Sequence, residues 1–295
     1  MDSPTPESSD EAYSMQWRAD IDRVVKEGHE ETLLDTVSST ISVTTGHFTH
    51  VPDPHPGYVE HRLHELWYAC IQAAKNFDSG GYLQDGLLRQ LLLAKALGPL
   101  QPPANRTVGV TFSDGHTIWS GLPLFAQDLG DEFTSRYYER TFYTSDQREN
   151  LAGFLGRLLS VGHYEGPALC MLSLFREILE VSRPLVADQD STEIPLDELL
   201  PALGKMLGNA GYSLSILSSN HSTVPLAGDY PVLSGLGALA VQAGNIPTSG
   251  YSPERWRFWM RRLKELSQCG VSSIEHDAKL YQEWMDDEQD VTKLL

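Results

Sequence analysis

Apolar residues recur at helical spacing in one segment after another, and this periodicity limits the chain to a mainly helical fold. From Tyr58 to Ala74, apolar side chains three and four residues apart form one continuous stripe. Comparable stripes end near glycines and prolines, such as Gly98-Pro99 and Gly162, which are typical of helix ends. We therefore expect an all-α fold of about nine to twelve helices, in a single domain of stacked antiparallel helices arranged as a bundle or as helix hairpins.

Two segments depart from this periodicity. Residues 101–118 allow one short hairpin, but their alternation is too brief for a sheet, so we expect at most one minor hairpin. Residues 1–12 are rich in Ser, Pro, Glu and Asp and predict a disordered acidic tail. The single helical domain is then expected to span residues 13–295.

Charge and hydropathy exclude several classes of partner. Acids outnumber bases 40 to 22 and the net charge is −18, which disfavours nucleic acid and anionic membrane surfaces. No apolar run reaches the roughly 18–20 residues that a membrane span needs. The N-terminus is acidic and lacks an apolar segment, so it resembles neither a secretory signal nor a transit peptide. We expect a cytoplasmic protein without a membrane span.

Five of the ten histidines lie between residues 47 and 65, which raises the question of a metal site. His61 with Glu65, and Glu60 with His64, are i,i+4 pairs that can place two ligands on one helix face. However, the chain has no His-Glu-x-x-His motif and no second ligand helix of the Glu-x-x-His type. We therefore expect surface histidines on a polar helix face and no metal.

Signatures of nucleotide cofactors and of serine nucleophiles are also missing. The run Gly235–Ala240 matches a loose Gly-x-Gly-x-x-Ala pattern, but no strand is expected before it. Close helix packing by small residues explains it better. The Gly204-Lys205 pair lacks the rest of a phosphate-binding loop, and no Gly-x-Ser-x-Gly occurs. The sequence predicts no cofactor.

The most distinctive helix is expected to begin at Ser252. Ser252 suits the N-cap and Pro253 the first helical position. Trp256 and Trp259 then share one apolar face, which we expect to pack against the helix that carries Trp284. The basic residues of this helix favour a solvated face over an anion site, with Arg255 near the helix start as the exception.

Two motifs resemble those of a known family. The Trp-x-x-Leu-Pro element at 119–123 and the Ser-Pro-Glu-Arg-Trp-x-x-Trp helix at 252–259 are similar to those of a fungal family of uncharacterised proteins. The resemblance covers roughly residues 60–285. It implies a mainly helical intracellular protein, and some members are encoded among secondary-metabolite genes. The family has no established catalytic residues that could be assigned here.

Two functions fit these observations. One is a cofactor-independent enzyme of fungal secondary-metabolite biosynthesis that cyclises or isomerises an apolar intermediate, with a Diels-Alderase-like cycloaddition among the candidate reactions. The other is a non-catalytic helical scaffold or protein-interaction module with an acidic surface. Genomic neighbourhood or a stable protein partner would discriminate between them. The oligomeric state is not fixed by the sequence.

For the enzyme, we expect a pocket between helices with aromatic walls and few polar groups, holding an apolar small-molecule substrate. Its candidate walls are Trp119, Tyr137 and Trp256. The candidate catalytic donors to a substrate carbonyl are His163, Tyr164 and Arg255. For each residue, the alternative is a place in the packed core or a cap at the surface.

Overall fold

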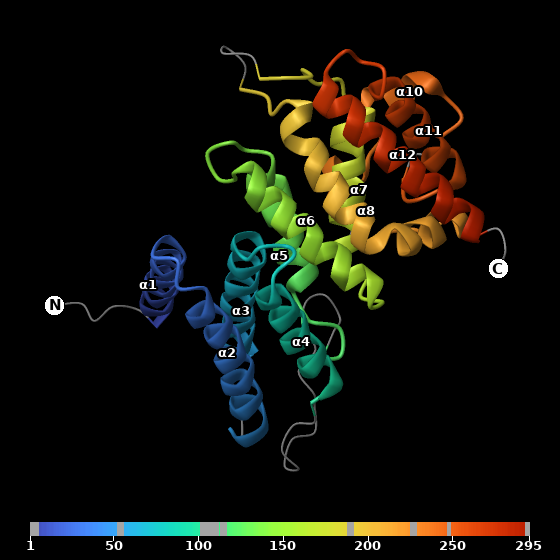
Figure 1. Cartoon of the computed structure of the whole chain (residues 1–295). Coiled ribbons are helices and arrows are strands. Elements are labelled where there is room, and N and C mark those ends of the chain that lie inside the picture. The colour runs from blue at the N-terminus through green and yellow to red at the C-terminus, as the bar shows by residue number, and fades with distance from the viewer. Residues whose placement is uncertain are drawn as a thin grey trace. The chain divides into compact units, whose positions relative to one another are not determined.

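The computed structural model describes residues 6–51, 56–100, 112, 117–187, 192–224, 229–246 and 249–292. Within these ranges the chain forms α-helices, two π-helical turns and no β-strand, which confirms the all-α prediction (Figure 1). The hairpin expected within residues 101–118 falls almost entirely outside the described residues. None of the helices in the described ranges combines the length and apolar character that a bilayer crossing requires.

The chain divides into two compact units, residues 1–128 and 129–295. In the first unit α3 packs against α1 and α2, and α2 also packs against α4. A further helix, α5 (Phe125–Glu132), contains the boundary between the units. The helices before it are α1 (Pro6–Lys26), α2 (Glu30–His50), α3 (Pro56–Asn76) and α4 (Tyr82–Ala96). Residues 6–12 of the expected tail therefore have helical backbone, and residues 1–5 lie outside the described residues.

In the second unit α8 packs against α6, α11 and α12. A Cβ at Gly204 of α8 would lie 2.2 Å from the Tyr281 hydroxyl of α12, so glycine is needed for this close approach. The elements are η1 (Phe133–Tyr137), α6 (Ser145–Ser160), α7 (Pro167–Phe175), η2 (Arg176–Glu180), α8 (Leu196–Ser219), α9 (Pro231–Ser234), α10 (Ala238–Ala243), α11 (Pro253–Leu266) and α12 (Ser272–Thr292).

Several helix ends lie where local sequence signals predict them. Helix α4 ends two residues before Gly98, and α6 ends two residues before Gly162. Both glycines have positive φ, the conformation that commonly ends a helix. At the start of α11, the Ser252 hydroxyl accepts the backbone N–H of Arg255 at 3.1 Å, and Pro253 occupies the first turn. The predicted N-cap is therefore confirmed.

Candidate functional site

The six predicted site residues are divided between the two units. Trp119 belongs to the first unit, and the other five belong to the second. The three predicted wall residues, Trp119, Tyr137 and Trp256, are almost completely buried in the protein.

Trp119 is held in a constrained turn inside the first unit. Its indole N–H donates to the Thr45 hydroxyl on α2 at 2.9 Å. Trp119, Leu122 and Leu124 all have positive φ, between 56° and 66°, in the left-handed region that non-glycine residues rarely adopt. The next residue after Leu122 is Pro123, whose carbonyl accepts the indole N–H of Trp67 at 2.7 Å. The Trp-x-x-Leu-Pro element is thus a strained loop tied to the helices by two buried indoles.

Tyr137 packs inside the second unit. Its ring stacks on Phe133 with a centroid distance of 4.1 Å, and its hydroxyl donates to the Arg148 carbonyl at 3.1 Å. Burial raises the pKa of the Tyr137 phenol, so it remains protonated at neutral pH. These contacts are those of a core tyrosine.

Arg255, a predicted donor to substrate, is 1% exposed, and every one of its donors has an acceptor in the protein. Its Nε and Nη2 donate to the two carboxylate oxygens of Glu180, at 2.6 and 3.1 Å. Nη1 donates to the carbonyls of Ser234 and Gly250, and Nη2 also donates to the Gly235 carbonyl. A guanidinium carries five N–H groups, and all five are used here. No donor of Arg255 is left for a substrate carbonyl in this arrangement.

Glu180 is the centre of this network and is completely buried at the end of η2. Besides the two bonds from Arg255, its carboxylate accepts the Trp259 indole N–H at 2.7 Å and the Gly237 backbone N–H at 2.9 Å. We call Glu180, Gly237, Arg255 and Trp259 the Glu180 core. It joins η2, α11 and the start of α10.

The aromatic face of α11 has a ring partner on α7 that the sequence did not indicate. Trp259 stacks on Phe175 of α7 with a centroid distance of 4.1 Å, and Trp256 lies 6.2 Å from the same ring. Helix α11 does contact α12, but the ring partner of Trp284 is Tyr281 of its own helix. Both indoles therefore contact the Phe175 ring of α7. The Trp256 indole N–H is buried and has no hydrogen-bond partner in the described part of the chain.

His163 and Tyr164 lie in the short turn between α6 and α7. His163 is buried, and its backbone N–H donates to the Leu158 carbonyl at 2.9 Å. Tyr164 is 39% exposed, and its carbonyl accepts the N–H of Ala168 in the first turn of α7. Their backbone bonds end one helix and begin the next.

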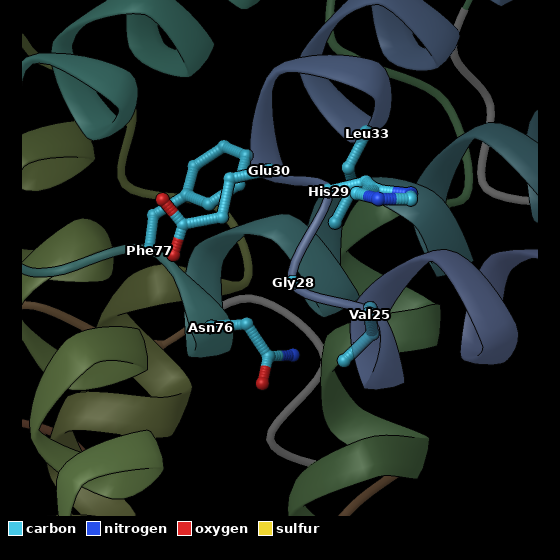
Figure 2. A pocket seen from close by; sticks show the side chains of 7 residues that line it. All are labelled: Val25, Gly28, His29, Glu30, Leu33, Asn76 and Phe77. Carbon is cyan, nitrogen blue, oxygen red and sulfur yellow. The ribbon is translucent and has the colours of Figure 1, made fainter.

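A pocket of about 230 Å³ lies in the first unit, at the turn from α1 to α2 and the end of α3 (Figure 2). Leu33 and Phe77 supply buried apolar surface, and His29, Glu30 and Asn76 supply polar groups. Val25 and Gly28 complete the lining. None of the six predicted residues lines it. Because the pocket is formed by helix ends rather than by an apolar stripe, no periodic signal in the sequence marks it.

Each described histidine of the histidine-rich stretch has its own protein contacts. His61 Nε2 lies 3.4 Å from the Glu65 carboxylate on α3. His64 Nδ1 lies 2.8 Å from the carboxylate of Asp128 on α5. The His47 ring packs on Tyr58, and His50 bonds to the backbone of its own helix. In the part of the chain that the structure describes, no three metal-ligating side chains gather around one point.

His64 and Asp128 form an imidazole–carboxylate pair that is partly open to solvent. The two side chains are 30% and 16% exposed. The hydrogen bond to Asp128 raises the pKa of His64, and Glu60 adds to this effect, whereas partial burial and the charge of Arg18 oppose it. The carboxylate therefore stabilises the protonated imidazole relative to a free histidine side chain.

Glu65 lies one residue further along α3, and its side chain is fully buried. Burial raises the pKa of Glu65, and the opposing effects come from Arg62, His61 and Arg18. We call His61, Arg62, His64 and Glu65, together with Asp128, the α3 cluster. The sequence placed the pairs of α3 on one helix but gave no sign of Asp128, which is 64 residues away from His64.

The described residues form a helical protein with a buried polar network, the Glu180 core, that holds helices together. Residues 67–263 match the family described as "Protein of unknown function (DUF3632)". The chain belongs to this family.

A protein of Penicillium oxalicum is also similar to this chain. It is named "Oxopyrrolidines biosynthesis cluster protein G" and is 29% identical over 237 residues. The match covers 74% of this chain and 64% of the relative, so the chain spans less than two thirds of that protein's length. No solved structure matches the chain. That the Ser252–Trp259 motif marks the family remains a prediction.

Proposed function

We propose that this protein acts in fungal secondary-metabolite biosynthesis, as a cytosolic, cofactor-independent enzyme that cyclises or isomerises an apolar intermediate. The observation that carries the proposal is the similarity to the Penicillium relative, whose name assigns it to a biosynthesis cluster. The cofactor-independent part rests on the sequence, which lacks signatures for nucleotide or metal binding.

Two features of the first unit support a chemical role. The pocket at the α1–α2 turn combines apolar side chains with three polar ones, the composition typical of small-molecule sites. The His64–Asp128 pair supplies an imidazole positioned by a carboxylate, an arrangement suited to proton transfer. Isomerisations of carbonyl compounds can proceed by such proton transfers, without a metal or nucleotide cofactor.

A non-catalytic role in the same pathway is the second candidate. It is favoured by the burial of Trp119, Tyr137 and Trp256, because packed side chains have little surface left for a substrate. A scaffold would bind a biosynthetic enzyme and change the yield of the product without converting any intermediate itself.

Deletion of the gene, followed by comparative metabolite profiling, tests the proposal. We expect one product to disappear and its precursor to accumulate. Purified protein is then incubated with that precursor, and conversion above the rate in buffer supports the enzyme. If deletion changes no metabolite, the biosynthetic role is overturned. If the precursor converts equally fast without protein, the scaffold takes the enzyme's place.

A further inference from the structure

We propose that the His64–Asp128 pair is a proton-transfer site, in which His64 is the catalytic base and Asp128 the positioning residue. The substrate class is a carbonyl compound with an acidic C–H bond next to the carbonyl. This inference rests on the proposed function and assigns its chemistry to named atoms.

The geometry determines which nitrogen of His64 is available. An ionised carboxylate only accepts hydrogen bonds, so the 2.8 Å contact requires that His64 Nδ1 carries a proton and donates it to Asp128. In the neutral ring the lone pair is then on Nε2. Among the described residues, Nε2 of His64 has no hydrogen-bond partner, and the side chain is 30% exposed. A base must have such a free, accessible nitrogen.

The surrounding charges suit a base that takes up a proton during the reaction. Asp128 on α5 and Glu60 on α3 stabilise the imidazolium, whereas Arg18 on α1 opposes it. Because Asp128 is hydrogen-bonded to the ring, its effect on the pKa of His64 is the largest. The carboxylate fixes the orientation of the ring and stabilises the charge that forms on it.

Two buried arginine N–H groups lie near the start of α3 or on the helix beside it. Arg18 Nε and Arg62 Nε make no hydrogen bond among the described residues, whereas His61 Nε2 and Glu65 Oε1 face each other as an ion pair at 3.4 Å. Buried polar atoms in native proteins are almost always paired, so unpaired ones call for a water or a ligand. Arg18, whose charge acts on the His64 ring, is a candidate donor to a carbonyl oxygen, on which negative charge develops when the adjacent C–H loses its proton.

The proposed step balances without any oxidant or reductant. Nε2 of His64 removes the proton of the C–H bond, and the bonding pair moves into the C–C–O system as an enolate. Where the substrate also has a β,γ double bond, the enolate is a dienolate, and the imidazolium returns the proton to its γ-carbon, which moves the double bond and completes an isomerisation. Alternatively, the enolate carbon attacks an electrophilic carbon of the same molecule, which closes a ring, and the proton goes to the oxygen or leaving group of the electrophile.

This site is distinct from the pocket at the α1–α2 turn. Asn76 lines that pocket and lies more than three helical turns beyond His64 on α3, a separation of roughly 18 Å along the helix axis. A small substrate in the pocket would not reach His64.

The test uses the deletion strain and its accumulated precursor. The strain receives wild-type protein, His64→Gln, Asp128→Asn or the control His50→Gln, in which an exposed histidine of α2 is replaced. We expect wild type and His50→Gln to restore the product. His64→Gln should lower the conversion of the precursor by at least 100-fold, as loss of a general base does. Asp128→Asn should lower the conversion less and shift the pH–rate profile to lower pH. Circular dichroism and thermal melting establish that each variant is folded.

The outcomes separate the two proposals. Deletion without any metabolite change overturns the proposed function, whereas full conversion by folded His64→Gln overturns the proton-transfer site alone. If His64→Gln does not fold, wild-type protein is modified with diethyl pyrocarbonate and mapped by mass spectrometry. Conversion of the precursor by protein labelled at His64 would then overturn the inference, and loss that hydroxylamine reverses would support it.

Discussion

The Glu180 core and the α3 cluster use the same kinds of side chain in opposite ways. In the Glu180 core, Arg255 has an acceptor for each of its five donors, and the carboxylate accepts four hydrogen bonds. In the α3 cluster, Arg62 keeps a buried N–H without a hydrogen bond, His61 Nε2 and Glu65 Oε1 meet at 3.4 Å without forming one, and His64 remains partly exposed. A saturated network stabilises one conformation, whereas an unsaturated one retains atoms that can bind a ligand.

This difference favours a structural role for Arg255 over the binding role proposed from the sequence. A basic residue at the start of an aromatic helix looks like a ligand-binding group, because its partner is invisible in the local sequence. Glu180 lies 75 residues earlier and gives Arg255 a structural role. The predictions below test the contrast between the two networks.

The largest loss of stability is expected from removal of Arg255. Arg255→Ala leaves the fully buried Glu180 carboxylate without its cation, and breaking such a pair costs about 3–5 kcal/mol of unfolding free energy. Arg257→Ala is the matched control, because Arg257 pairs with Glu254 at the exposed face of the same helix and its loss costs at most about 1 kcal/mol. Denaturant unfolding measures both. Equal effects of the two variants would refute the structural role of the Glu180 core.

Two substitutions of Trp259 distinguish the contribution of ring packing from that of hydrogen bonding in the Glu180 core. Trp259→Ala removes the ring stacked on Phe175 and is expected to cost about 3–5 kcal/mol, as large aromatic truncations do. Trp259→Phe keeps an aromatic ring but removes the N–H that Glu180 accepts, at a cost of about 1–3 kcal/mol. Unfolding curves that show no loss for either variant would remove Trp259 from the core.

Gly237→Ala tests the close backbone packing of the Glu180 core, and Gly46→Ala, which should change stability in the opposite direction, is its control. A Cβ at Gly237 would lie 2.5 Å from the Glu180 carbonyl oxygen, a backbone atom, so Gly237→Ala should destabilise by about 1–3 kcal/mol. Gly46 in the interior of α2 has open space around it, so Gly46→Ala should stabilise by about 0.5–1 kcal/mol. A thermal melt that rises for Gly237→Ala would contradict the close packing of the Glu180 core.

How much of the molecule the sequence predicts depends on the range of the interactions involved. The helices and the caps at Ser252, Gly98 and Gly162 come from residues a few positions apart, so periodicity and end signals predict them. The Glu180–Arg255 and His64–Asp128 pairs join residues far apart in the chain, and no local pattern indicates them. The three positive φ angles from Trp119 to Leu124 are likewise imposed by tertiary packing, because the residues themselves disfavour them.

The smallest stability effect is expected at the α3 cluster and depends on pH. The pKa of His64 is raised in the folded protein, so its contribution to stability is fully present below about pH 6.5 and is lost as the pH rises through the folded pKa. Asp128→Asn should therefore cost about 1 kcal/mol near pH 5.5 and clearly less near pH 8.5. Unfolding free energies of both proteins at the two pH values check this. A larger cost at the higher pH would contradict the protonated pair.

The most direct test of the contrast between the two networks is an NMR titration of the His64 ring in wild type and in Asp128→Asn. We predict a pKa above 6.5 in wild type and a lower value in Asp128→Asn, because the carboxylate stabilises the imidazolium. Ring nitrogen shifts at high pH should place the proton of the neutral ring on Nδ1, with Nε2 free. A wild-type pKa at or below 6.5, an unchanged value in the variant, or a proton on Nε2 would contradict the account.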